Sequence, residues 1–355
     1  DLEIGEFENV MLECAIVTQA AYEASPDQMA TTPVGTSAYL VDSYVPGSEI
    51  VMKDTGDYWQ TDESLVHGTS IHNVGEIHFS VITEASQHTV ALYTNSVDIS
   101  NGVPDTDISK FEEGGEFSDG NAVSVVMDNL TYDVEYNMSD SSVFKDDDNL
   151  RLALAYAIDK DGINVGVFNG NGTAVKDFAN ATYPDYNSEW DSEDYYDYDV
   201  DKAKELLQKA GYNNEKLVLV TTPDYQEMYN ATLVVQEQLK KAGINAEVES
   251  YDFSTFMEHR ADPKQFSMFI TSNSYNMLPI QLSVLDKGWA GLDRPEVSEG
   301  IEKIRSAANA EDASAAWADL QTFLYEYGAA TVIGHYTGIS AMPVSYTHLR
   351  AHETL

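Results

Sequence analysis

Cysteine is almost absent from this sequence, which contains Cys14 and no other cysteine. A single thiol forms no internal disulfide bond, so the chain is not a disulfide scaffold. The cysteine content therefore does not tell whether the protein works in an oxidising or a reducing compartment. No run approaches the ~18 apolar residues of a membrane span. The first residues, Asp1 to Gly5, resemble neither a secretory leader nor a translation start. We therefore expect that a leader has been removed or that the chain is a fragment.

Basic residues are also scarce. The chain has 19 Lys and Arg against 60 Asp and Glu, a formal net charge of −41 and a pI near 4.1. Such a surface repels phosphate backbones and anionic lipid headgroups, which excludes non-specific binding to nucleic acids. However, 43% of the residues are hydrophobic and 11% are aromatic, enough for folded cores. A length of 355 residues predicts two or three domains.

Common catalytic signatures are missing. The sequence has no Gly-Lys dipeptide, and no Gly-x-Gly-x-x-Gly follows an expected strand, which excludes both usual phosphate-binding loops. It also lacks His-Glu-x-x-His and Gly-x-Ser-x-Gly. A secreted acidic hydrolase with paired carboxylates remains an alternative, although the sequence alone does not bring any two acids together.

Two acidic segments have some of the features of a metal site. Asp105, Asp107, Ser109 and Glu116 fit part of a calcium loop, but Lys110 occupies the position that requires glycine. Residues 189–201 form an acidic, tyrosine-rich patch that could hold a cation loosely. A solvated acidic loop is the favoured interpretation of both segments, so we predict no metal site and no cofactor.

Residues 344–355 do not continue the pattern before them. Their sequence resembles a translated sequencing adaptor, and we exclude them from the interpretation as an artefactual tail. The pair His348 and His352, spaced i,i+4, would otherwise have suggested zinc binding.

The first part of the chain is rich in expected strands. Short β-branched and aromatic runs alternate with turn sequences, and Ser86 to Leu92 could form a short helix. The expected strands are 39–44, 49–52 and 77–82, followed by a strand pair around 122–127 and 131–136.

The pattern changes to helices and buried strands after Asp146. Apolar residues at helical spacing predict helices at 150–158, 200–210, 225–242, 295–308 and 313–327. Strands are expected at 217–221, 244–248 and 266–271, and residues 331–335 form a further apolar segment. The β-α-β unit at 217–249 indicates an α/β fold with parallel strands, whose carboxyl ends are the expected location of ligands.

Several strings, in order, resemble the extracellular solute-binding protein family 5, the peptide-binding components of ABC importers. The first three are Pro33 to Tyr39, Asp57-Tyr58-Trp59 and Leu92 to Ile99. The helix Asn149 to Lys160 follows, with Arg151 and Asp159 as polar positions beside an apolar face; then come Tyr198 to Tyr212 and Leu239 to Ile244. The resemblance extends from about Cys14 to Pro343. Departures from the family pattern include Ser37-Ala38 for Gly-Pro, Asn95 for glycine and Val200 for proline.

The resemblance implies a periplasmic-binding-protein-like, two-lobed α/β fold of class II (cluster C), incomplete here because members of the family are longer at both ends. Residues 1–136 would form part of lobe I and be β-rich. Residues 137–333 would form lobe II, and residues 334–343 would begin the return to lobe I. Residues 344–355 are the artefactual tail.

The same resemblance places the ligand between the lobes. The implied binding residues are Tyr136, Asn137, Thr271, Ser272, Asn273, Ser274, Tyr275, His335 and Tyr336. For the tyrosines, ordinary core packing is an equal alternative. Peptide-binding members carry an aspartate that pairs with the ligand's α-ammonium group, and this chain has Ser274 near that position. Asp286 or another acid could replace it.

The implied function is therefore capture of a peptide or similar small solute and its delivery to a permease and ATPase complex, without catalysis. The implied location is extracellular or periplasmic, with membrane tethering through a lipoprotein leader that this sequence lacks. We expect a monomer that binds no nucleic acid. A ligand sensor feeding a membrane receptor is the alternative that sequence cannot separate from an importer component.

Overall fold

The computed structural model describes residues 16–66, 72–179, 186–191, 196–274, 282–290 and 292–345. The described chain divides into two compact units: residues 126–337 form unit 1, and residues 16–125 with 338–345 form unit 2. The backbone passes between the units on strands β4 (Asn121–Tyr136) and β9 (Ala330–Pro343). The domain boundaries expected from the sequence, at Tyr136 and Ile333, lie on these same two strands.

Unit 2 contains a small antiparallel sheet in the order β1-β2-β3, formed by Tyr39–Val45, Glu49–Asp54 and Glu76–Ser80. Ile50 pairs with Tyr44 on one side and Phe79 on the other, so one face of the sheet is apolar. The helices of this unit are α2 (Gln19–Ala24), α3 (Ala85–Tyr93) and α4 (Ile108–Phe111). A separate core packs α3 and α4 against the end of β9, through Leu92, Phe111 and Ile339.

Unit 1 is built on a six-stranded mixed sheet in the order β5-β9-β4-β8-β6-β7. Its remaining strands are β5 (Thr173–Ala174), β6 (Leu217–Thr221), β7 (Ala246–Ser250) and β8 (Met268–Ser274). β6 runs parallel to β7 and β8, whereas β4 is antiparallel to β8. The helices are α5 (Asp148–Ala157), α6 (Lys160–Phe168), α7 (Val200–Ala210), α8 (Gln226–Ala242), α9 (Phe253–Ala261), α10 (Lys287–Ala290), α11 (Pro295–Arg305) and α12 (Ala310–Tyr327).

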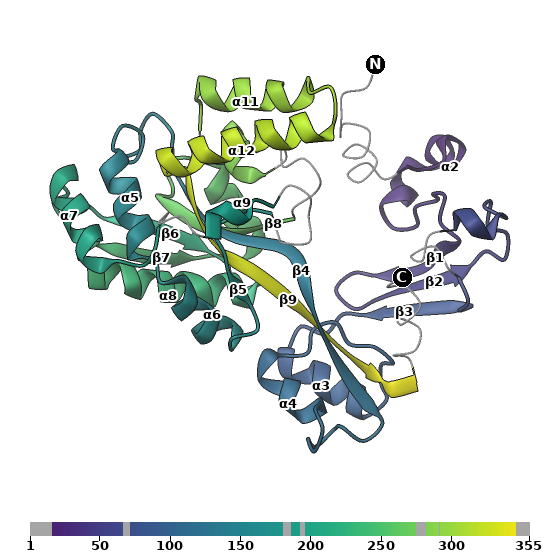
Figure 1. The fold of residues 1–355 in the computed structure, drawn as a ribbon. Coiled ribbons are helices and arrows are strands. Elements are labelled where there is room, and N and C mark those ends of the chain that lie inside the picture. The colour runs from purple at the N-terminus through teal and green to yellow at the C-terminus, as the bar shows by residue number, and fades with distance from the viewer. Residues whose placement is uncertain are drawn as a thin grey trace. The chain divides into compact units, whose positions relative to one another are not determined.

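Helices cover both faces of this sheet, with α6 and α8 on one face and α9, α11 and α12 on the other (Figure 1). Successive strand residues point to opposite faces. Tyr132 of β4 therefore contacts Phe168 of α6, with ring centres 6.2 Å apart. Asp133 and Glu135 point to the opposite layer, where Arg260 of α9 lies over the ring of Phe269. This two-sided burial explains why the central strands carry few exposed residues.

The predicted β-α-β unit is confirmed by β6, α8 and β7. The helix predicted at 200–210 is confirmed as α7: Asp199 caps it by accepting a hydrogen bond from the backbone N–H of Lys202 at 2.9 Å. Gly211 ends it with φ +68°, a conformation that favours glycine. These signals are local in sequence, which is why they could be predicted accurately.

The strand pair expected around 122–127 and 131–136 is wrong, because residues 121–136 form the single strand β4. The residues between the two expected strands, 128–130, include neither glycine nor proline, so the backbone can stay extended. The helices that were not predicted are α2, α4, α6, α9 and α10. Of the described helices, none combines the length and apolar character needed to cross a bilayer.

Helices α11 and α12 pack closely because Gly300 faces Leu320. A β-carbon at position 300 would lie 2.9 Å from Leu320 Cδ1. Overpacking should cost Gly300→Ala about 1–3 kcal/mol, and the higher helix propensity of alanine offsets up to about 1 kcal/mol, so we expect a net loss of up to about 2 kcal/mol in the free energy of unfolding. The matched control is Gly166→Ala in α6, where a β-carbon meets nothing within 4 Å; helix propensity should make it neutral or stabilising by up to about 1 kcal/mol. Urea unfolding of both variants provides the measurement, and equal effects would contradict the packing argument.

Candidate functional site

A cluster of polar side chains lies at the carboxyl end of β8, the kind of position where α/β sheets bind ligands. Asn273, near the end of this strand, donates from Nδ2 to Asp133 Oδ1 of the neighbouring strand β4 at 2.8 Å. Its Oδ1 accepts a hydrogen bond from Ser283 Oγ at 2.7 Å. Ser283 Oγ also lies within hydrogen-bond distance of Glu135 Oε1, so Asn273 is held by Asp133 and Ser283 by Glu135.

Asp133 and Glu135 are both fully buried, with no exposed surface. One oxygen of each, Asp133 Oδ2 and Glu135 Oε2, has no hydrogen-bond partner among the residues that the structure describes. Burial raises the pKa of Glu135 to about 7, and burial together with the neighbouring charge of Glu135 raises the pKa of Asp133 well above its usual value. The pair therefore holds protons at a pH where ordinary carboxyl groups are ionised.

Arg260 borders this cluster and gives it a positive charge. The guanidinium carbon lies 3.3 Å from the ring centre of Trp289, a cation–π contact, and the residue is 6% exposed. Burial lowers the pKa of Arg260 to about 10, while the charge of Glu135 opposes that shift. The cluster thus combines two carboxyl groups, an arginine, an amide and a hydroxyl within one buried layer of unit 1.

Two residues predicted for the hinge lie in the core of unit 1. Tyr136 is fully buried, its ring centre lies 5.6 Å from that of Phe144, and its hydroxyl lies 2.6 Å from Thr331 Oγ1. Asn137 donates from Nδ2 to the backbone oxygens of Pro263 and Phe266, at 2.6 and 2.9 Å. The polar atoms of both side chains are therefore engaged within unit 1.

His335 is also buried, with 3% of its surface exposed. Its Nδ1 lies 3.1 Å from Thr131 Oγ1 and its Nε2 lies 3.2 Å from the backbone oxygen of Ala179. Burial lowers the pKa of His335, so the neutral ring is favoured. Thr271 lies opposite Asp133 in the β4–β8 register, which brings it to the polar cluster.

Ser272 pairs with Tyr132 and points to the other face of the sheet, away from Asn273. The backbone of Ser274 pairs with Leu130 at the end of β8. The side chains of Ser274 and Tyr336, and all of Tyr275, lie outside the described residues. The binding role of all nine residues stays a prediction.

Asp286, the candidate replacement for the missing aspartate, is exposed and accepts a hydrogen bond from Gly288 N at 2.7 Å. Its charge contributes to the raised pKa of Glu135, so it lies near the cluster.

Sequence reasoning missed Asp133, Glu135 and Arg260. The available signal was two acids at alternate positions of a strand whose other residues, such as Val134, are apolar.

The acidic loop that partly fits a calcium-binding motif, residues 105–116, makes other contacts in the structure. Asp107 accepts a hydrogen bond from Thr89 Oγ1 at 2.6 Å and forms an ion pair with Lys110 at 2.7 Å. Among the described residues, no group of three or more His, Cys, Asp or Glu side chains could hold a metal ion.

A mixed sheet flanked by helices in unit 1, joined by two strands to a smaller unit, defines the periplasmic-binding-protein class of fold. The oligopeptide-binding protein AppA from Bacillus subtilis, solved in complex with a nonapeptide, matches with a TM-score of 0.77. The two proteins are 18% identical, and the match covers 97% of this chain and 70% of AppA. At this identity the likeness concerns the fold alone.

The chain belongs to the bacterial extracellular solute-binding proteins, family 5, whose profile matches residues 5–283. It is 26% identical to the dipeptide-binding protein of Escherichia coli over 243 residues, which are 67% of this chain and 42% of the relative. It is also 26% identical to the nickel-binding protein NikA of Staphylococcus aureus over 224 residues, 62% of this chain and 42% of NikA. The chain thus spans less than half the length of these two curated relatives.

Proposed function

We propose that this chain is part of the solute-binding component of an ABC importer. It captures a peptide or related small solute and delivers it to a permease and ATPase complex. The observation that carries the proposal is the family profile that matches residues 5–283. The similarity to proteins named for dipeptide and nickel binding supports a small solute but leaves its chemistry open between these classes.

The proposed protein works as a monomer outside the cell or in the periplasm, tethered to the membrane through a lipidated leader. Its net charge of −41 then serves to keep the protein soluble and is not part of ligand recognition. It binds and releases its solute without catalysis, which is consistent with membership in a family of solute-binding proteins.

Within unit 1, we assign recognition to the residues at the end of β8, and to Asp133 and Glu135 the task of holding them. Asn273 is fixed by hydrogen bonds to Asp133 and Ser283. A side chain locked in this way keeps a defined orientation toward a ligand at low entropic cost. The two carboxyl groups themselves have no exposed surface, so they support Asn273 from the interior of the protein.

A paired-carboxylate hydrolase is disfavoured by the same burial. General acid–base catalysis needs carboxyl groups within hydrogen-bond reach of the substrate. Asp133 and Glu135 are fully buried. Neither of them lines the cavity around Ile158 and Lys160 or the cavity around Leu150 and Tyr212. Burial explains the raised pKa of Glu135, and burial with the charge of Glu135 explains that of Asp133, without a catalytic role.

Thermal unfolding in the presence of candidate solutes tests the proposed function. The panel contains di- to nonapeptides, single amino acids, sugars and nickel with histidine, offered to this chain and to any longer gene product that contains it. A ligand at 100 times its Kd stabilises the folded state by about 2.7 kcal/mol, so the midpoint should rise by several degrees. Asn273→Ala should reduce that shift. Hydrolysis of a peptide or sugar without a midpoint shift would contradict the proposal.

A further inference from the structure

Ser283 connects Asn273, at the end of β8, to the buried carboxyl group of Glu135. It begins a short 3-10 helix, Ser283–Leu285, and only 4% of the residue is exposed. Its Oγ lies 2.7 Å from Asn273 Oδ1 and within hydrogen-bond distance of Glu135 Oε1. A hydroxyl group has a single hydrogen, so it cannot donate to both oxygens. The two contacts therefore need a second hydrogen from one of the two neighbours.

The orientation of the Asn273 side chain decides which neighbour supplies that hydrogen. The backbone N–H of Ser283 donates to the same side-chain oxygen at 3.3 Å, and Asn273 Nδ2 donates to Asp133 Oδ1 at 2.8 Å. The atom that faces Ser283 Oγ is thus the amide oxygen, which carries no hydrogen. The second hydrogen must then belong to Glu135, as a protonated carboxyl group. The donors run in one direction, from Glu135 through Ser283 and Asn273 to Asp133.

Ionisation of Glu135 reverses the middle of this network. The hydroxyl of Ser283 then donates to the carboxylate, because a charged acceptor forms the stronger hydrogen bond. Asn273 Oδ1 faces a lone pair of Ser283 Oγ and, among the described residues, keeps only the backbone N–H at 3.3 Å. The orientation of the Asn273 side chain therefore depends on one proton at Glu135.

Charged groups on the neighbouring elements influence when this proton is lost. Burial raises the pKa of Glu135 to about 7; Arg260 of α9 opposes this shift, and Asp286 adds to it. Burial, followed by the charge of Glu135, raises the pKa of Asp133, so ionisation of Glu135 makes Asp133 hold its proton more tightly. The tyrosines near Asp133 stay neutral, since burial raises their pKa values; they are Tyr136 and Tyr325.

We propose that Glu135 is a proton-dependent positioning residue: its protonated carboxyl group holds Asn273, through Ser283, in the orientation that binds solute, and its ionisation releases that side chain. This inference rests on the proposed function, which assigns solute recognition to Asn273. The site then binds its solute more tightly at mildly acidic than at mildly alkaline pH. The loss of one neutral hydrogen bond corresponds to a change of about 2- to 10-fold in affinity.

Nuclear magnetic resonance of the Asn273 side-chain amide tests the switch in this chain without any solute. Asparagine is labelled selectively with nitrogen-15, and Asn273→Asp identifies the signal. Spectra are recorded across the titration of Glu135, from about pH 5 to about pH 9. We expect the amide signal to shift with a midpoint near the pKa of Glu135, about 7. A signal that does not change in this range overturns the proposal.

Two variants separate the proton of Glu135 from that of Asp133. The amide of Glu135→Gln can donate as well as accept, so it gives Ser283 Oγ a hydrogen at every pH, and the Asn273 signal should keep its low-pH position. Asp133→Asn keeps an acceptor for Asn273 Nδ2, so the titration of that signal near neutral pH should remain. The opposite pattern, with the titration kept in Glu135→Gln and lost in Asp133→Asn, overturns the proposal.

Calorimetric titration with the dipeptide alanyl-alanine, at about pH 6 and about pH 8, measures the consequence for binding. The affinity of the parent should fall about 2- to 10-fold more than that of Glu135→Gln, whose comparison cancels the titration of the dipeptide itself. An equal fall in both proteins would contradict the positioning role. Absence of dipeptide binding at both pH values would count against the proposed peptide ligand, whereas the Asn273 signal still decides whether the switch exists.

Discussion

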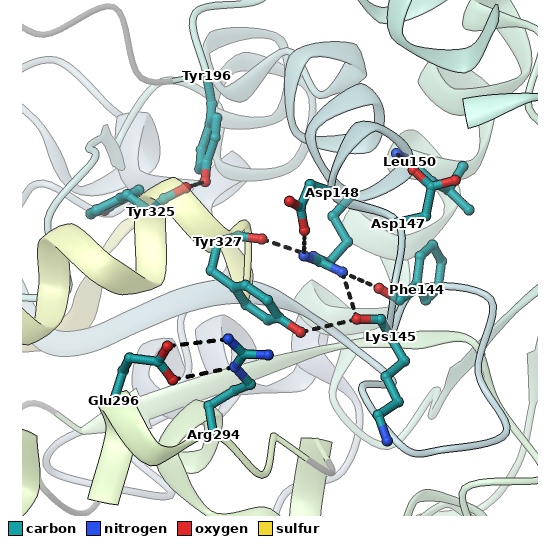
Figure 2. A network of polar contacts seen from close by, with 11 residues as sticks. Phe144, Lys145, Asp147, Asp148, Leu150, Tyr196, Arg294, Glu296, Tyr325 and Tyr327 are labelled. Atoms are coloured by element: carbon teal, nitrogen blue, oxygen red, sulfur yellow. Dashed lines mark hydrogen bonds and ion pairs between the residues drawn. The ribbon is translucent and has the colours of Figure 1, made fainter. Parts of the chain in front are cut away.

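Replacing Arg151 with methionine should lower the free energy of unfolding of unit 1 by about 3–5 kcal/mol, because a fully buried cation satisfies several acceptors at once. Its Nε donates to the backbone oxygen of Tyr327 at 2.8 Å, and its Nη1 donates to those of Phe144 and Lys145 (Figure 2). Its Nη2 pairs with Asp148. The variant removes the donors to the backbone oxygens of Phe144 and Tyr327, whereas that of Lys145 keeps the hydroxyl of Tyr327 at 3.1 Å.

A second arginine beside the same tyrosine provides the control. Arg294 lies 5.2 Å from the ring centre of Tyr327, against 3.9 Å for Arg151, but its side chain is 43% exposed and pairs with Glu296 at 3.1 Å. Arg294→Met should therefore cost less than about 1 kcal/mol. Urea titration followed by tryptophan fluorescence suits both variants, since Trp190, Trp289 and Trp317 all lie in unit 1. Similar losses of unfolding free energy in the two variants would show that the burial of the arginine does not determine the effect of its removal.

The two arginines illustrate which features the sequence could predict. The helix around Arg151 was predicted from the spacing of its apolar residues, and α5 confirms it at Asp148–Ala157. Arg151 itself was expected to be a polar position beside that apolar face. Its burial depends on Tyr327, which is distant in the sequence, and no local pattern reports such a contact.

The same distinction separates the predicted part of the fold from the candidate site. Caps and stop signals such as Asp199 and Gly211 act within a few residues, so α7 could be placed correctly. The polar cluster instead forms because β4 and β8 pair side by side, bringing Asp133 opposite Thr271 and next to Asn273. The loop after β8 was predicted as a site from its place at the carboxyl end of an expected strand and from the family resemblance, whereas the two carboxyl groups of β4 require knowledge of strand order.

Removing one of these carboxyl groups should change the pH dependence of stability. Glu135 has a pKa of about 7 in the folded protein and about 4.5 when exposed, so between these values the folded state binds a proton that the unfolded state releases. Its contribution is therefore complete below pH ~4 and is lost as the pH rises to ~7. A shift of this size corresponds to roughly 3 kcal/mol.

Glu135→Gln keeps an acceptor for Ser283 Oγ but removes the ionisable group. The variant should match the parent near pH 4 and exceed its stability by up to roughly 3 kcal/mol at pH 8, where the parent must ionise a buried carboxyl group. It should also bring down the pKa of Asp133, which the charge of Glu135 helps to raise. Urea titrations of both proteins from pH 4 to 8 measure this difference.

Comparing parent and variant is necessary because other carboxyl groups act in the opposite direction. Hydrogen bonds from Thr255 lower the pKa of Asp252, for example, so its contribution to stability grows as the pH rises. Such groups are common to both proteins and cancel in the difference. If instead the two proteins matched near pH 4 and the parent were the more stable at pH 8, Glu135 would be stabilised as a carboxylate, with Arg260 as its effective counter-charge. Asn273 would then be held by an ionised network rather than a protonated one.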